Sequence, residues 1–360
     1  MKRCLCLALF LLFILLSATA RAVVVEDLYT VELPVEDQST SLRLKVFNLA
    51  FRDVIIKVSG TSETIEHPAL GQPLRSSSRY VHQFRYLTRK TKQENSFDAG
   101  QLFLRVVFNQ EAIENLLREN GIPVWGKERP STLFLFNYER NQSASIVSGD
   151  TTPGVVEAIE VLARERGIPV LFPLLDLEDR VHFGIQDINA FNEQKMTLAA
   201  ARYAPDALLV GRITQRTEGW LGQWQAYFSN QVFKWSFKGD TDIEVFRQAI
   251  ARLGQTLAKE YALATFAATD EELLLAVDQM KGLTDHIRVQ AYLQSLDAIE
   301  AARLVLVEQD KVTYRVNLRN SSEDLSRLIG LSDVLEQLEL PQIDATTENR
   351  EIIMNYRLIH

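Results

Sequence analysis

Cysteine is nearly missing from this chain, which has two in 360 residues, Cys4 and Cys6. Both lie at the extreme N-terminus, so the rest of the chain has no disulfide, no thiolate nucleophile and no cysteine metal ligand. Many exported proteins use disulfides, but a chain of this length buries enough apolar surface to fold without them.

The sequence also lacks the short motifs of several enzyme classes, among them G-x-S-x-G, H-E-x-x-H, G-x-x-x-x-G-K-[ST] and S-x-x-K. The five histidines are scattered, and no two stand at the spacing of a metal site. They are His67, His82, His182, His286 and His360. We therefore expect no cofactor and no resident metal.

Positive charge is in deficit, with 39 Lys and Arg against 47 Asp and Glu and a formal net charge of -8. Nucleic-acid binding depends on clustered Lys and Arg, so this balance argues against a nucleic-acid partner. It also argues against a basic protein that binds membrane surfaces. After the N-terminal segment, no apolar stretch is long enough to cross a bilayer.

The first 22 residues have the pattern of a secretory signal peptide. Lys2 and Arg3 precede an apolar run, Leu5 to Leu16, and small residues follow up to Ala22. The run is short for a membrane-spanning helix, which needs roughly 20 residues. We predict cleavage after Ala22, with Ala20 as the alternative, and a mature protein in the periplasm.

The mature chain divides into regions that predict an α+β and α/β multidomain protein. Residues 23–129 predict a small α+β domain, with a strand at Val23 to Leu33, a helix at Leu42 to Val58 and two further strands before a helix capped by Asn109. Residues 130–268 alternate strands with helices and predict a central α/β sheet. One of those helices is expected from Asn189 to Tyr203.

The C-terminal region, residues 269–340, has the order β-α-β-β-α-β of a ferredoxin-like domain. Its strands are expected at Leu273 to Met280, Arg303 to Glu308, Val312 to Leu318 and Val334 to Leu340. The tail, residues 341–360, is mostly polar and is expected to be loose or lightly docked.

The segment Ile122 to Pro130 (IPVWGKERP) resembles an uncharacterised bacterial family, domain of unknown function 2066 (DUF2066). Arg52 to Gly60, Arg85-Tyr86 and Tyr203 to Gly211 are also similar to that family. The resemblance implies an exported protein, and it brings no activity and no catalytic residue. The central region is further similar to α/β domains of bacterial envelope accessory proteins, which mostly dock onto other proteins.

The densest cluster of potentially chemical side chains lies on one segment after Phe172-Pro173. Its members are Asp176, Glu178, Asp179, His182 and Asp187. Carboxylates with a histidine suit a divalent cation or acid–base chemistry. A solvated, charged loop also explains them and is the favoured interpretation, because loops are polar by default.

Aromatic side chains crowd one predicted hairpin. Along its second strand Phe233, Trp235 and Phe237 alternate with polar residues, which indicates one aromatic face packed under a helix. Trp220 and Trp224 stand beside glycines and are the candidates for outward-facing, partner-binding residues. Trp125, in the proline-stiffened connector between the first two regions, is predicted to pack as an interdomain plug.

Two functional hypotheses follow. The first is a non-catalytic envelope protein that binds a protein or cell-wall partner, with Trp220 and Trp224 at the contact. The second is a metal-dependent or acid–base hydrolase centred on Asp176 to Asp187. The lack of a convergent catalytic constellation favours the first.

Overall fold

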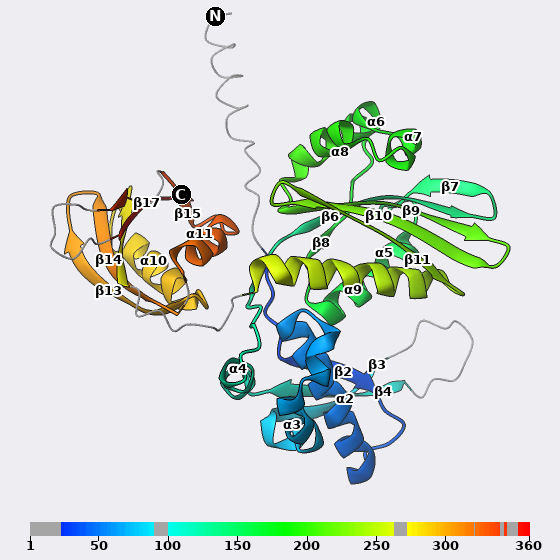
Figure 1. Ribbon diagram of the computed structural model, residues 1–360, viewed down its shortest axis with the longest axis horizontal. Coiled ribbons are helices and arrows are strands. Elements are labelled where there is room, and N and C mark those ends of the chain that lie inside the picture. Colours follow the sequence, from blue (N-terminus) through cyan, green and yellow to red (C-terminus); the bar gives the residue numbers. More distant parts are fainter. Residues whose placement is uncertain (1–22, 90–99, 263–271, 320, 339–341, 344–351) are drawn as a thin grey trace, which may run out of the picture.

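The computed structural model of the chain describes residues 23–89, 100–262, 272–319, 321–338, 342–343 and 352–360. Helices and strands form three sheet-based units that follow one another along the chain (Figure 1). The predicted α+β multidomain class is confirmed. The predicted signal segment, residues 1–22, lies outside the described residues. Among those that are described, no helix has the length and apolar character needed to cross a membrane.

The N-terminal unit is a three-stranded sheet with the order β2-β4-β3, covered by a long helix. Its strands are β2 (Thr30–Pro34), β3 (Val81–Arg89) and β4 (Gln101–Phe108), and its helices are α2 (Thr40–Ser59), α3 (Gly71–Arg75) and α4 (Gln110–Glu119). Short 3-10 turns lie at η1 (Ser62–Glu66), η2 (Pro68–Leu70) and η3 (Ser77–Tyr80). Helix α2 begins where the Ser39 side chain accepts from a backbone N–H and ends at Gly60, whose φ of 77° suits glycine.

The central unit has a six-stranded sheet between two layers of helices. Its strands are β6 (Thr132–Arg140), β7 (Ser143–Ile146), β8 (Val170–Leu171), β9 (Ala207–Arg216), β10 (Gly219–Phe228) and β11 (Gln231–Gly239). The helices are α5 (Pro153–Arg166), α6 (Leu177–His182), α7 (Ile185–Asn189), α8 (Glu193–Ala200), η4 (Ala201–Tyr203) and α9 (Asp242–Tyr261). Helices α5 and α9 cover one face, and α6 to α8 cover the other (Figure 1).

The two faces of this sheet follow from the alternation of side chains along β6. Phe134 and Phe136 belong to the core under α5 and α9, whereas Leu133 and Leu135 belong to the core under α6 to α8. Both faces are covered, so the strand is buried over most of its length.

The helix predicted from Asn189 to Tyr203 is confirmed from Glu193 onward, where α8 and η4 follow each other, but its start is wrong because a break separates it from α7. Helix α7 ends at Asn189, and Phe191 has a positive φ of 50°. The Asn192 side chain then accepts from the N–H of Lys195 and starts α8.

The C-terminal unit is a six-stranded sheet with helices α10 (Leu283–Ser295) and α11 (Ser322–Gly330). Its strands are β12 (Glu272–Asp278), β13 (Ile299–Val307), β14 (Lys311–Leu318), β15 (Leu335–Gln337), β16 (Gln342–Ile343) and β17 (Ile352–Leu358). The elements from β12 to β15 follow the predicted order β-α-β-β-α-β. The sheet order is β13-β14-β12-β17-β15, with β16 also paired to β17.

The prediction of a loose C-terminal tail is wrong for the last strand. Strand β17 lies between β12 and β15 and pairs in parallel with β12, from Leu273↔Ile352 to Asp278↔Arg357. It therefore takes the place beside β12 that a ferredoxin-like sheet gives to its fourth strand. Met354, Tyr356 and Leu358 are buried, and this apolar alternation is what holds the strand in the sheet.

A short connector, β5 (Glu128–Arg129), joins the units and pairs with β1 (Val23–Val24). Arg129 is fully buried, and its guanidinium lies 4.1 Å from the ring of Trp125. That guanidinium donates to the backbone carbonyls of Lys57, Trp125, Gly126, Arg166 and Gly167. Trp125 is 1% exposed, and its backbone N–H donates to the carbonyl of Val58. The predicted packing of Trp125 at this join is confirmed.

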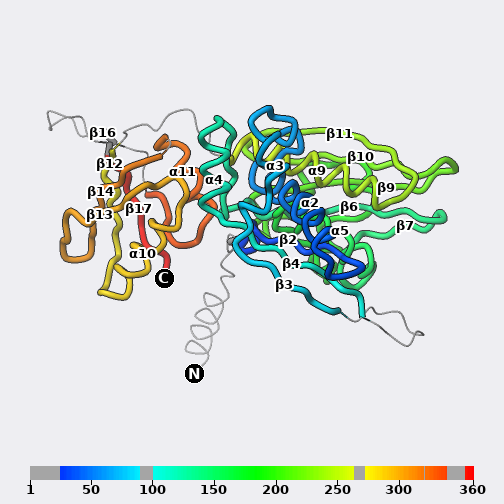
Figure 2. The backbone as a smooth tube through the Cα atoms, turned by 90° about the horizontal axis from the view of Figure 1, so that it is seen from below, coloured from blue at the N-terminus to red at the C-terminus, as the bar shows by residue number. Residues whose placement is uncertain are grey.

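The C-terminal unit meets the same connector beside α4 (Figure 2). A Cβ added to Gly126 would lie 1.7 Å from the Asp297 Oδ2, so glycine is needed for this close approach. Glu128 is 6% exposed, and its Oε2 has no hydrogen-bond partner among the described residues. Burial raises the pKa of Glu128 to about 7, and the nearby Asp297 adds to the shift.

Candidate functional site: a free apolar sheet edge

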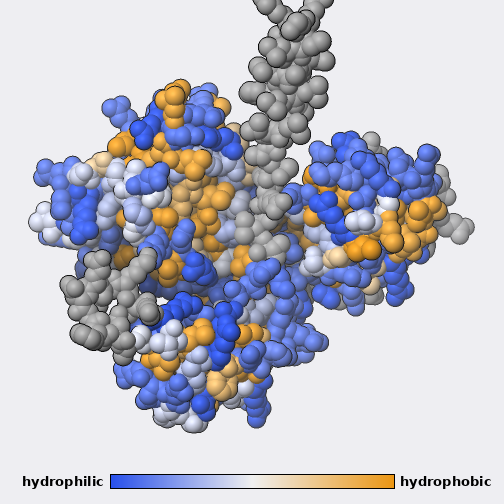
Figure 3. Space-filling view, turned by 180° about the vertical axis from the view of Figure 1, so that it is seen from behind, coloured by the Kyte–Doolittle hydropathy of each residue, from blue (hydrophilic) through white to orange (hydrophobic). Residues whose placement is uncertain are grey.

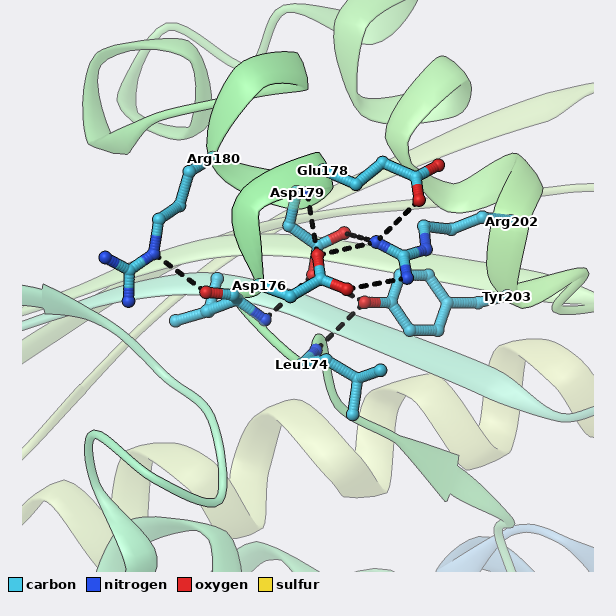
Figure 4. A network of polar contacts seen from close by, with 8 residues as sticks. Leu174, Asp176, Glu178, Asp179, Arg180, Arg202 and Tyr203 are labelled. Carbon is cyan, nitrogen blue, oxygen red and sulfur yellow. Dashed lines mark hydrogen bonds and ion pairs between the residues drawn. The ribbon is translucent and has the colours of Figure 1, made fainter.

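Three of the carboxylates predicted as a possible metal or acid–base site, Asp176, Glu178 and Asp179, surround the side chain of Arg202 (Figure 4). Asp176 caps α6 and accepts from Arg202 at 2.8 and 2.9 Å. Asp179 is 1% exposed and accepts from the Arg202 Nη1, the Tyr203 hydroxyl and the Leu175 N–H. The hydrogen bonds from Arg202 hold the pKa of Asp176 well below its usual range. These groups are engaged with one another and fasten α6 to the segment that leads into β9.

The other predicted members of the cluster lie apart from this network or at its rim. Glu178 reaches Arg202 at 3.6 Å. Asp187 caps α7 through the Gly184 N–H and pairs with Lys195 at 2.8 Å. Among the residues that the structure describes, no three His, Cys, Asp or Glu side chains are arranged to hold a metal ion. Sequence reasoning missed Arg202, which stands more than twenty positions from the carboxylates it binds.

The expectation that Trp220 and Trp224 project outward is wrong. Trp224 is 2% exposed and Trp220 is 8% exposed, and both belong to the core under α9. The neighbouring glycines make room for the indole, since a Cβ on Gly211 would lie 2.2 Å from the Trp224 ring and one on Gly222 would lie 2.7 Å from its Nε1. Trp220 stacks on Tyr138 at 5.3 Å. The aromatic face of the hairpin packs in the core, so Trp220 and Trp224 are not available on the surface to bind a partner.

The edges of the sheets differ in how they are protected against pairing with another strand. Strand β11 is an edge of the central sheet and carries exposed Lys234 and Lys238. Strand β3 carries Arg85 and Arg89, while β7 and β15 have only four and three residues. Charged residues and short edge strands are common defences against edge-to-edge association. Strand β13 also has nine residues and carries exposed Glu300 and Arg303, but its last four residues form an aliphatic run without a charge.

Four consecutive aliphatic side chains at the end of β13 are exposed. They are Leu304 (47%), Val305 (50%), Leu306 (50%) and Val307 (62%). Among the described strands, β13 pairs on one side only, with β14. Two exposed side chains of the adjoining helix α10, Leu283 (73%) and Ile287 (59%), add to the apolar surface of this unit, the one to the right in Figure 3. We call these six residues the edge patch.

The backbone on the free side of β13 is covered at one end only. The Gln290 side chain on α10 donates to the carbonyl of Ala302 at 3.1 Å. Beyond that point, within the described part of the chain, no side chain bonds to the backbone from Arg303 to Val307. Unpaired backbone groups beside apolar side chains are the recognition features of strand addition.

Arg303 and Glu308 flank the aliphatic run, and both are exposed. Neither makes an ion pair among the described residues. The segment from Arg303 to Glu308 thus has a basic end, an apolar centre and an acidic end. The predicted strand Arg303 to Glu308 is confirmed in substance, but its position at a sheet edge depends on the order of distant strands.

A second group of exposed aliphatic side chains lies around α6 and α8. It comprises Leu174 (63%), Leu177 (81%), Val181 (74%) and Leu198 (61%). These side chains stand on helices and their flanks, where the backbone groups are already bonded in the turns. This surface therefore lacks the free backbone edge of β13.

Comparison with known proteins corrects the family resemblance. The profile of a family described as a domain of unknown function (DUF8605) matches residues 22–126. This is a different family from DUF2066, so the resemblance drawn from Ile122 to Pro130 is wrong. The match covers the N-terminal unit and ends inside that segment.

Among solved structures, the crystal structure of TolB from Acinetobacter baumannii is similar over 42% of this chain, at 16% sequence identity and a TM-score of 0.22. The matched part spans 32% of that protein. No curated protein matches the chain significantly.

Proposed function

We propose that this chain is an exported, non-catalytic binding protein whose docking site is the free edge of β13. An extended segment of a polypeptide partner adds to β13 as a further strand. Its main-chain groups bond to the free side of the strand, and its aliphatic side chains cover the edge patch. The observation that carries the proposal is the run from Leu304 to Val307, exposed on an edge strand of nine residues.

Two features support a binding role over the hydrolase alternative. The carboxylates Asp176 and Asp179 are held by Arg202 and Tyr203, so the predicted acid–base cluster serves the attachment of α6. The chain also bears the exposed aliphatic side chains of the edge patch, and grouped exposed apolar side chains are typical of interaction sites.

Export through the periplasmic route rests on the sequence of residues 1–22. Lys2 and Arg3, the apolar run and the small residues before Ala22 make a cleavable signal. Mass spectrometry of the protein from a periplasmic extract should give an N-terminus at Val23 or at Arg21. An intact Met1 on protein recovered from the cytosol would contradict export.

Strand addition is tested with a peptide library displayed on phage and panned against residues 23–360. Selected peptides should be rich in alternating aliphatic residues, and Val305→Lys should abolish their binding, because a lysine on the edge opposes pairing. Val232→Lys is the matched control, since Val232 is 41% exposed on β11, another edge strand of nine residues. Peptides that bind the wild type and Val305→Lys equally would overturn the proposal.

A further inference from the structure

The sequence at the free end of β13 is complementary to itself. Residues 303–308 read Arg-Leu-Val-Leu-Val-Glu, and all six are exposed. In an antiparallel alignment of two such segments, the basic end of each faces the acidic end of the other. The four aliphatic residues then face aliphatic residues.

Resting on the proposed function, we propose that the strand added to β13 is β13 of a second copy of this chain. The two strands run antiparallel about a two-fold axis between Val305 and Leu306. Arg303 of each copy faces Glu308 of the other, and the two six-stranded C-terminal sheets become continuous. Such an interface is isologous, so it closes as a dimer and leaves no free β13 edge.

The register shift of β13 between Leu304 and Leu306 permits this pairing. Gln290 donates to the Ala302 carbonyl, so Ala302 turns its backbone groups to the free side, and alternation places Leu304 there as well. At the hairpin, the Glu308 N–H donates to the Lys311 carbonyl, so Glu308 faces β14 and Val307 faces the free side. Both assignments hold together because the register shifts by one residue between Leu304 and Leu306.

Leu304 and Val307 therefore both offer backbone groups to a partner, although they are three positions apart. They face each other across the axis only if that axis lies between Val305 and Leu306. In a regular strand, the residues whose backbone groups face the same side are an even number of positions apart. The two-fold axis of a pair of such strands would then pass through a residue. That register would set Arg303 against Val307 and leave the arginine without its acidic partner.

The pairing of opposite charges at β13 favours a second copy in this register, whereas the overall charge of the chain opposes contact elsewhere. The chain has a net charge of -8, so two copies repel each other over most of their surfaces. At β13 the proposed register brings together two oppositely charged pairs and no like pair. The paired segment is short, so we expect a weak dimer with a dissociation constant in the micromolar range, roughly 1 to 100 µM.

The test is sedimentation velocity of residues 23–360 over loading concentrations from about 1 to about 300 µM, a range that brackets the expected constant. Wild-type protein should shift from monomer to dimer. Arg303→Glu should weaken the dimer by about tenfold or more, because each variant dimer carries two repulsive pairs. Glu308→Arg should do the same.

The double variant Arg303→Glu/Glu308→Arg restores both pairs with their signs exchanged and should recover the wild-type constant. A simple loss of folding cannot mimic this recovery. A wild type that stays monomeric throughout, or a double variant that stays as weak as the single variants, would overturn self-pairing. If the wild type is monomeric while Val305→Lys still abolishes peptide binding, self-pairing fails and the docking function stands.

Discussion

Two β-hairpins of this molecule differ from what their compositions indicate: the aromatic hairpin is buried in a core, and the aliphatic hairpin has an exposed edge. The hairpin β10–β11 holds three of the four tryptophans of the chain, and Trp220 and Trp224 are buried in its core face. The hairpin β13–β14 has no tryptophan, yet its aliphatic residues from Leu304 to Val307 are exposed. The difference arises from what covers each strand.

Helix α9 packs along β10 and β11, so large aromatic side chains have a surface to bury against. The end of β13 has no such cover among the described residues. The aromatic content of a strand therefore indicates that it contributes to a core. Whether its side chains are exposed depends on which elements cover it in the folded protein.

Substitutions in the two hairpins should give the largest difference in the free energy of unfolding, because one site is buried and the other is exposed. Trp224→Ala should lower the free energy of unfolding by about 3 to 5 kcal/mol, because it leaves a cavity over Gly211 and Gly222. Leu306→Ala, at an exposed site, should change it by less than about 0.5 kcal/mol. Urea unfolding of both variants measures the difference. Similar losses in the two variants would mean that the edge patch is covered in solution.

The extent to which the sequence predicted the structure follows from how local each signal is. Helix α2 was predicted closely because its end is encoded by Gly60 beside the helix itself. Strand β17 was missed because its partner β12 lies about eighty residues earlier in the chain. The alternation of Met354, Tyr356 and Leu358 indicates a strand, but nothing local says which strand it joins.

The candidate sites show the same limit. Asp176 and Asp179 are three positions apart in the sequence, but Arg202, which pairs with both, comes from η4. The aliphatic run of β13 was recognised as a strand, and its edge position depends on the complete order of the sheet. Residue type and spacing thus predicted the helices and strands. The candidate sites could not be predicted in this way, because they depend on which distant segments pair in the folded protein.

The stability of the junction next to β13 should depend on pH, because this junction contains a buried acid. Glu128 is buried with a pKa raised to about 7 from an ordinary value of 4.5, and Asp297, two residues before β13, adds to the shift. A raised pKa means that the folded state binds the proton more tightly. Stability is therefore greatest below about pH 4.5 for this group and falls as the pH rises to about 7, by up to about 3 kcal/mol.

The measurement is urea unfolding at several pH values between 4.5 and 8 for the wild type and for Glu128→Gln. The glutamine variant is neutral throughout, so this part of the pH dependence should be lost in it. Glu157→Gln, on the exposed side of α5, is the matched control and should follow the wild type. A Glu128→Gln variant with the full wild-type slope would show that another group, such as Asp297, titrates instead.

Removing the two lysines of β11 should have the smallest effect on stability. It tests directly whether charged side chains are what distinguishes the edge strand β11 from β13. Lys234→Val and Lys238→Val together should leave the free energy of unfolding within about 1 kcal/mol of the wild type, since both lysines are exposed. They should nevertheless remove the charged side chains from the free edge of β11. We expect this to add concentration-dependent association beyond that of β13. In a Val305→Lys background, where β13 is blocked, sedimentation velocity should detect this association alone. If the double substitution leaves the protein monomeric there, the absence of charge is insufficient to open an edge. The register shift and the flanking Arg303 and Glu308 would then account for what distinguishes β13.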